Sequence, residues 1–183
     1  MTGADRGDRG NTAAMRTLRS RSLVAVVGAL VMCVGVHAAS ATVVYGYPLT
    51  DRCPAAGVAE EVDRWGMFAC NCTSYVAWAL QANGQRLDWF VPGAMDAHNW
   101  AHVAKLSLLP IGVLPRRGAV VVWPNLEPPF GHVAYVTGVD SDGGFDVAEY
   151  NFPPASGAGP FLFDRRKDVS RTGAIFIYVP HRG

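Results

Sequence analysis

The order of hydrophobic patterns along the chain constrains its fold more than any other sequence feature. From Asn71, a plausible N-cap, apolar residues recur every three or four positions until Asn83-Gly84, and this pattern predicts a helix. A second helix is expected from about Ala94 to Ala104, with Trp100 and Val103 facing inward. Beyond this point the helical period gives way to β-branched runs and alternation, so the sheet comes after the helices.

The β-type segments predict an antiparallel sheet. One of them ends in Asp140-Ser141-Asp142-Gly143-Gly144, a strong hairpin signal. Helices followed by hairpin-linked strands indicate an α+β fold. The short basic run Arg165-Arg166-Lys167 is interpreted as a solvated turn, and residues 42–64 as an irregular arm. The predicted strands cover residues 119–123, 132–139, 145–151 and 174–179.

The N-terminal stretch has the features of an export signal. Arg16, Arg19 and Arg21 precede an apolar run from Leu23 to Val36, and Ala39-Ser40-Ala41 fits a cleavage site. The run is shorter than the roughly 20 residues that span a bilayer as a helix. We therefore expect a secreted, periplasmic or envelope protein that meets the membrane only through this segment. An uncleaved anchor is the alternative.

This signal divides the chain into two parts. Residues 1–41 are expected to be an N-terminal extension and signal peptide, whose true start is hypothesised to be Met15, and residues 42–183 one catalytic domain. The formal net charge of the chain is +1 and part of its basic count lies in the signal, so the domain is near neutral. A protein without a basic stripe is not expected to bind nucleic acid. We expect a monomer.

The cysteine count points to one free thiol. If Cys33 leaves with the signal, then Cys53, Cys70 and Cys72 remain in an oxidising compartment. Two of these three residues can form a disulfide. The third is left as a thiol that can be reactive.

Cys72 begins the predicted helix, where outward-pointing N–H groups and the helix dipole favour a thiolate. Such a nucleophile needs a base, and His132 is the candidate, with the small Gly131 leaving room for a substrate backbone. A third group must orient the imidazole. Glu149 and Asn151 leave the same face of the next strand, and either side chain is suited to this role.

Three segments resemble the motifs of the CHAP family, the cysteine, histidine-dependent amidohydrolases/peptidases, which are papain-like. The similarity extends in the family's order from about Trp65 to Val179. It implies a papain-like α+β fold with the nucleophile helix packed on an antiparallel sheet. The segments that carry the resemblance are residues 71–78, 131–136 and 147–151, supported by 65–66, 97–100 and 118–123.

The resemblance also implies an activity and its residues. CHAP proteins cleave amide bonds in peptidoglycan, as N-acetylmuramoyl-L-alanine amidases or peptide endopeptidases, which implies a peptidoglycan substrate. By motif, Cys72 is the nucleophile, His132 the base, Glu149 the group that orients the imidazole, and Asn151 a polar group that completes the site. No metal or organic cofactor is expected.

Two positions depart from the family pattern. Ala119 stands where an acidic residue is common, but this position opens a strand and is not catalytic. Cys70 stands where a polar residue is common. We expect Cys70 to pair with Cys53 and leave Cys72 free, although a reversible Cys70–Cys72 pair would switch the enzyme off in oxidant.

Other residues have simpler interpretations. His98 and His102 have metal-ligand spacing but no obvious third ligand, so they are expected to be a surface pair or a pair with satisfied hydrogen bonds. Most tryptophans are expected in the core. Trp123 precedes a proline-rich loop leading to His132 and is the predicted substrate contact.

The alternatives to this hydrolase are a secreted dithiol redox protein using Cys70 and Cys72, and a non-catalytic wall-binding domain. A secreted toxin that attacks competing cells would share the hydrolase chemistry.

Overall fold

The computed structural model describes residues 42–53, 60–91, 96–152 and 160–183, and these lie in one compact unit, Ala39–Gly183. The predicted signal peptide, with Met15 and Cys33, lies outside the described residues, as does the predicted start of the second helix at Ala94. Within the described ranges no helix combines the length and the apolarity needed to cross a membrane.

The first predicted helix is confirmed as α1 (Cys72–Ala82). It begins directly after Asn71 and ends at Ala82, followed by the C-cap Asn83 and by Gly84, whose φ of +71° suits a residue without a Cβ. Most of its side chains are buried, including Tyr75, Val76 and Leu80, because α1 packs against the sheet. The helix start therefore holds Cys72 at the border of the core.

The second predicted helix is shorter than expected. A 3₁₀ turn, η2 (Ala97–Asn99), leads into α2 (Trp100–Leu106). Trp100 and Val103 are buried as predicted, with 1% and 6% of their surface exposed. The inward face was thus correctly identified from the spacing of apolar residues.

Among the described residues, six strands form one antiparallel sheet in the order β1-β6-β2-β3-β4-β5. The predicted strands are confirmed as β2, β3, β4 and β6, although β6 is shorter than expected. The strands are β1 (Ile111–Gly112), β2 (Val120–Trp123), β3 (His132–Val139), β4 (Phe145–Tyr150), β5 (Phe163–Val169) and β6 (Ile175–Ile177).

The interpretation of Arg165-Arg166-Lys167 as a solvated turn is wrong, because these residues lie within β5 at the edge of the sheet. Most charged residue types are less frequent in strands than elsewhere. Pairing with β4 overrides that preference, and the register joins Val147 to Arg166 and Glu149 to Asp164.

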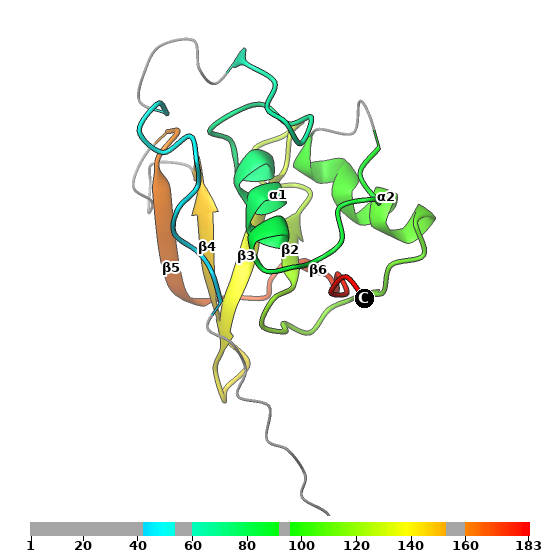
Figure 1. The fold of residues 1–183 in the computed structure, drawn as a ribbon. Helices are drawn as coiled ribbons and strands as arrows, with labels where there is room; N and C mark the ends of the chain where they lie inside the picture. Colours follow the sequence, from blue (N-terminus) through cyan, green and yellow to red (C-terminus); the bar gives the residue numbers. More distant parts are fainter. Residues whose placement is uncertain (1–41, 54–59, 92–95, 153–159) are drawn as a thin grey trace, which may run out of the picture. The chain divides into compact units, whose positions relative to one another are not determined.

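The two faces of the sheet bury different side chains. Val133 and Tyr135 of β3 pack in the cluster that includes α1, whereas Ala134 and Val136 belong to a second cluster on the other face. Helix α1 contacts β3 and β4, as Figure 1 shows. By strand alternation, the side chain of His132 shares the face of Ala134. It therefore lies on the side of the second cluster, at the first position of β3, opposite Trp123 of β2 in the register.

The expected disulfide is present. Cys53 and Cys70 are bonded with their Cα atoms 5.3 Å apart, and Cys72 is the free cysteine among the described residues. The bond attaches the N-terminal arm to the segment that leads into α1. The arm has no regular secondary structure over 42–53 and buries Tyr47 against the core.

Replacing Cys53 and Cys70 together with serine should lower the free energy of unfolding by about 3 kcal/mol, because the bond closes a loop with a sequence separation of 17. Urea denaturation followed by tryptophan fluorescence measures this change. Cys72→Ser removes a thiol that makes no disulfide, so it is the matched control and should shift the midpoint much less. A double variant as stable as wild type would contradict a constraining role for the disulfide.

Candidate active site

The predicted nucleophile lies in a cleft of about 550 Å³. Asn71, Cys72 and Thr73 line it from the start of α1, Gly131 from the residue before β3, and Asn151 from the end of β4. Three segments distant in sequence therefore meet at one cavity. Cys72 is partly exposed there, whereas the residues that follow it in the helix are buried.

His132 lies almost wholly buried beside this cleft, with 1% of its surface exposed. Burial lowers the pKa of the imidazole, but the charge and hydrogen bonds of Cys72 and Glu149 outweigh it and raise the pKa to about 9. A buried histidine with this pKa is protonated at neutral pH. The arrangement therefore favours an imidazolium facing the sulfur of Cys72.

Glu149 is the group that holds the imidazole. Its Oε2 lies 2.8 Å from Nε2 of His132, and the carboxylate has no exposed surface. This contact leaves Nδ1 of the ring for Cys72. Burial alone would raise the pKa of Glu149, but hydrogen bonds from His132 and Arg166 lower it, so the group stays ionised. Of the two side chains predicted to orient the ring, Glu149 makes the contact.

Asn151 makes different contacts. Its Nδ2 donates to Oδ1 of Asn71 over 2.7 Å, and its Oδ1 accepts the N–H of Phe161 over 2.9 Å. Asn71 stands at the N-cap position of α1, but its side chain makes no capping hydrogen bond. The side-chain oxygen that would cap the helix is occupied by Asn151. The backbone N–H groups beside Cys72 are consequently not capped by Asn71.

Gly131 lines the cleft, and the space that its missing Cβ leaves is filled by the backbone of η2. A Cβ on Gly131 would lie 2.6 Å from the backbone nitrogen of His98, and its φ of +72° is in the left-handed region. The adjoining backbone is fixed by a 2.8 Å hydrogen bond from His98 N–H to the carbonyl of Phe130. The glycine therefore permits close packing of η2 against the entry to β3.

Trp123 lies behind the imidazole and is not among the residues that line the cleft. Its ring is 6.0 Å from that of His132 in a stacked arrangement, and 8% of its surface is exposed. Trp78, Trp89 and Trp100 lie in the core, as expected. Trp123 is positioned to support the imidazole from the second core cluster.

Arg166 is a residue of this site that no pattern in the sequence indicated. Its guanidinium binds both carboxylate oxygens of Glu149, with Nε on Oε1 and Nη2 3.1 Å from Oε2. The sequence contained only an indirect signal for such a residue. The negative charge of a carboxylate buried next to a histidine requires a further positively charged partner. Composition alone could not show which arginine supplies it.

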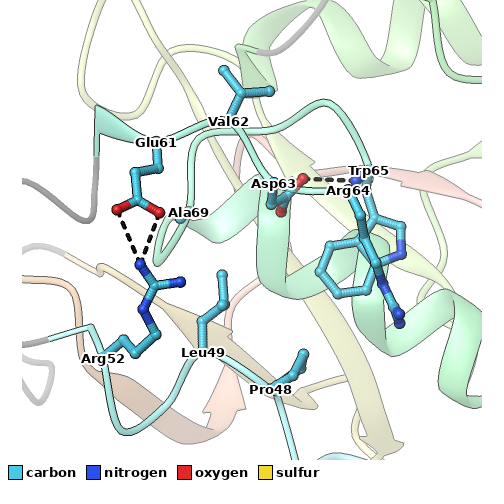
Figure 2. A pocket seen from close by; sticks show the side chains of 9 residues that line it. All are labelled: Pro48, Leu49, Arg52, Glu61, Val62, Asp63, Arg64, Trp65 and Ala69. Atoms are coloured by element: carbon cyan, nitrogen blue, oxygen red, sulfur yellow. Dashed lines mark hydrogen bonds and ion pairs between the residues drawn. The ribbon is translucent and has the colours of Figure 1, made fainter.

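A separate pocket of about 310 Å³ lies between the arm and residues 61–69. Arg52 pairs there with Glu61, with 2.9 Å between Nη2 and Oε2, and Oδ1 of Asp63 accepts the backbone N–H of Trp65 (Figure 2). The lining residues include no cysteine or histidine. The nucleophilic chemistry of the described residues is thus concentrated at the Cys72 cleft.

Comparisons with known proteins point to the same region. Staphylococcal secretory antigen SsaA of Staphylococcus epidermidis is 37% identical over 84 residues, which cover 46% of this chain and 30% of the antigen. SsaA of Staphylococcus aureus strain NCTC 8325 is 37% identical over 62 residues, covering 34% of this chain and 24% of that protein. The chain thus spans less than a third of the length of these curated relatives.

The crystal structure of an N-acetylmuramoyl-L-alanine amidase from Staphylococcus aureus matches with a TM-score of 0.50 and 26% sequence identity. The match covers 60% of this chain and 30% of that one. Together with the helix on an antiparallel sheet, it supports the predicted papain-like α+β fold. Residues 62–151, which include Cys72, His132, Glu149 and Asn151, match the family model of the CHAP domain, which confirms the predicted resemblance to that family.

Proposed function

We propose that this protein is an exported cysteine hydrolase that cleaves an amide bond in the peptide part of peptidoglycan. The products would be those of an N-acetylmuramoyl-L-alanine amidase or of a peptide endopeptidase. Support for the substrate comes from the CHAP match and the amidase similarity. Support for export comes from the N-terminal signal pattern and from relatives named secretory antigens.

One observation carries the proposal: a free cysteine at a helix start interacts electrostatically with a buried histidine, which a buried carboxylate holds through a hydrogen bond. Each group has a chemical task. The thiolate is the nucleophile, the imidazolium is the acid, and Glu149 fixes the ring and stabilises its charge.

In the first half-reaction, the thiolate of Cys72 attacks the carbonyl carbon and forms a C–S bond. The N–H groups at the start of α1 are positioned to stabilise the negative charge on the carbonyl oxygen. The C–N bond then breaks, and His132 gives its proton to the leaving amine. A thioester on Cys72 and a neutral imidazole remain.

In the second half-reaction, water attacks the thioester while neutral His132 accepts its proton. The C–S bond breaks, the acid product leaves, and the thiolate–imidazolium pair is restored. Glu149 stays ionised throughout, because its hydrogen bonds lower its pKa. Cys72 therefore supplies the nucleophile, and His132 supplies the proton transfers, in both half-reactions.

The competing functions have less support. A dithiol redox protein would need Cys70 and Cys72 as partners, but Cys70 is bonded to Cys53. A non-catalytic wall-binding domain would not need the buried imidazole and its ionised carboxylate, which cost desolvation free energy. A secreted toxin remains a variant of the same proposal, since it shares the reaction and differs in target.

The proposal is tested by digesting purified peptidoglycan with the purified protein in reducing buffer. Mass spectrometry of the soluble products identifies the new termini. Release of an L-alanine amino terminus indicates the amidase, whereas a new terminus within the peptide indicates the endopeptidase. Walls of several peptide chemistries should be compared. The absence of new termini from all of them would refute the proposal.

The activity should decline as the pH rises through about 9. The raised pKa of His132 means that the thiolate–imidazolium pair is present below this value and is lost above it. The free energy of unfolding should likewise decrease as the pH rises. The contribution of the pair is complete below the ordinary histidine pKa of about 6.5 and disappears as the pH passes the raised value. Initial rates measured from pH 6 to 10.5 check this predicted decline in activity. A decline centred near pH 6.5 would contradict the raised pKa of His132.

A further inference from the structure

Arg166 is held more firmly than its place on an edge strand suggests. It lies on β5, C-terminal to the segment that matches the CHAP family, and its side chain is 19% exposed. Besides binding Glu149, its guanidinium lies 3.7 Å from the ring centroid of Phe152 and 5.4 Å from that of Trp123. The aromatic rings restrict where the planar guanidinium can lie.

These contacts complete a row of four groups. The row runs from Cys72 through His132 and Glu149 to Arg166, and neighbouring members interact directly. In the active protonation state their charges alternate: thiolate, imidazolium, carboxylate and guanidinium. Alternation makes every adjacent interaction attractive and the row neutral overall. Such a row can be buried at a lower cost than any shorter part that carries a net charge.

We propose that Arg166 is a positioning residue that fixes the Glu149 carboxylate and thereby maintains the thiolate–imidazolium pair of Cys72 and His132. The proposal rests on the proposed cysteine chemistry. Arg166 does not touch the nucleophile, so its effect passes through Glu149. Its two-point hydrogen bonding prevents rotation of the carboxylate, which keeps Oε2 directed at Nε2 of His132.

The surroundings of Glu149 determine the sign of the effect. The groups that face it are His132 from β3 and Arg166 from β5; Cys72 of α1 lies beyond the imidazole, and Asp164 is its register partner on β5. Loss of the guanidinium removes a cation that favours the carboxylate anion. Glu149 would then be protonated at a higher pH, and a neutral Glu149 no longer stabilises the imidazolium.

The test follows the alkylation of Cys72 by iodoacetamide in the full-length protein as a function of pH. Iodoacetamide reacts with the thiolate, and mass spectrometry of the peptide that contains Cys72 separates this site from other cysteines. In Arg166→Gln, the pH below which alkylation slows should rise by roughly one unit. Arg166→Lys keeps the positive charge but loses the two-point hydrogen bonding of the guanidinium. The pH below which its alkylation slows, called the acid limb of the profile, should therefore stay near that of wild type.

Arg165→Gln is the matched control. Arg165 is adjacent on the same strand, but it is exposed and bonds to the hydroxyl of Tyr45. Its alkylation profile should equal that of wild type. If Arg166→Gln lowers the melting temperature but leaves the acid limb unchanged, Arg166 is a structural residue and the proposal is wrong.

If Arg166→Gln does not fold, the kinetics of Arg166→Lys test the positioning role of Arg166. Hydrolysis by Arg166→Lys should show a several-fold lower kcat at an unchanged KM, because the carboxylate is less well oriented. A wild-type kcat, or an acid limb that moves in Arg166→Lys, would overturn the proposal. Alkylation needs no substrate, so failure to cleave peptidoglycan would refute the proposed function and leave this test of Arg166 intact.

Discussion

Replacing Cys72 with alanine should reduce the release of peptidoglycan fragments by about 10⁴- to 10⁶-fold, because no other thiol is among the described residues that line the cleft. The side chain is partly exposed and makes no disulfide, so its removal should leave the fold intact. The kcat of the variant, measured on the fragment that wild type releases, gives the size of the effect.

The same variant has a second, independent readout. The charge and hydrogen bond of Cys72 contribute to the raised pKa of His132, so this pKa should fall below about 9 when the sulfur is removed. Titration of the His132 ring by NMR measures the change, with the exposed His98 as an internal control. A Cys72→Ala protein that retains wild-type turnover would rule out thiol chemistry.

Replacing Glu149 with glutamine should lower kcat by roughly 10²- to 10⁴-fold. Glutamine has nearly the same shape but is neutral, so it no longer stabilises the imidazolium. Its amide can also present an N–H to Nε2 of His132, which favours the wrong ring tautomer. Initial rates at saturating substrate measure the loss.

Asp146→Asn is the control for Glu149→Gln. Asp146 lies on the same strand, and its carboxylate accepts the backbone N–H of Asp168 at an exposed position, remote from the imidazole. The control should retain wild-type turnover. Thermal denaturation of both proteins separates a chemical defect from unfolding, since Glu149→Gln also leaves Arg166 without its anion. Equal turnover in Glu149→Gln and wild type would contradict the orienting role of the carboxylate.

The sequence was most informative where structure depends on neighbours along the chain. The apolar spacing and the Asn83-Gly84 stop predicted α1, and alternation followed by a glycine-rich turn predicted β3 and β4. These features are local, because capping, turn formation and the direction of side chains depend on a few adjacent residues. They were sufficient to predict that Cys72 begins a helix and that His132 and Glu149 lie on successive strands.

The functions of Asn151 and Gly131 depend on contacts that the sequence pattern does not encode. Asn151 follows the register of the sheet until its end, where a φ of +54° turns it toward Asn71. Gly131 is needed because the backbone of His98, 33 positions earlier in the chain, packs against it. Neither the contact of Asn151 with Asn71 nor that of Gly131 with His98 follows from the periodicity of the sequence.

The sequence by itself determined that a cysteine begins a helix, that a histidine begins a strand, and that an acid follows on the next strand. Only the tertiary structure decided how the charge of that acid is balanced. Arg166 looked like part of a solvated basic run, yet β5 places it on the carboxylate of Glu149. The physical reason is that burial is a property of the assembled sheet. A charged residue is recognised as a partner only when the desolvated group that requires it is in place.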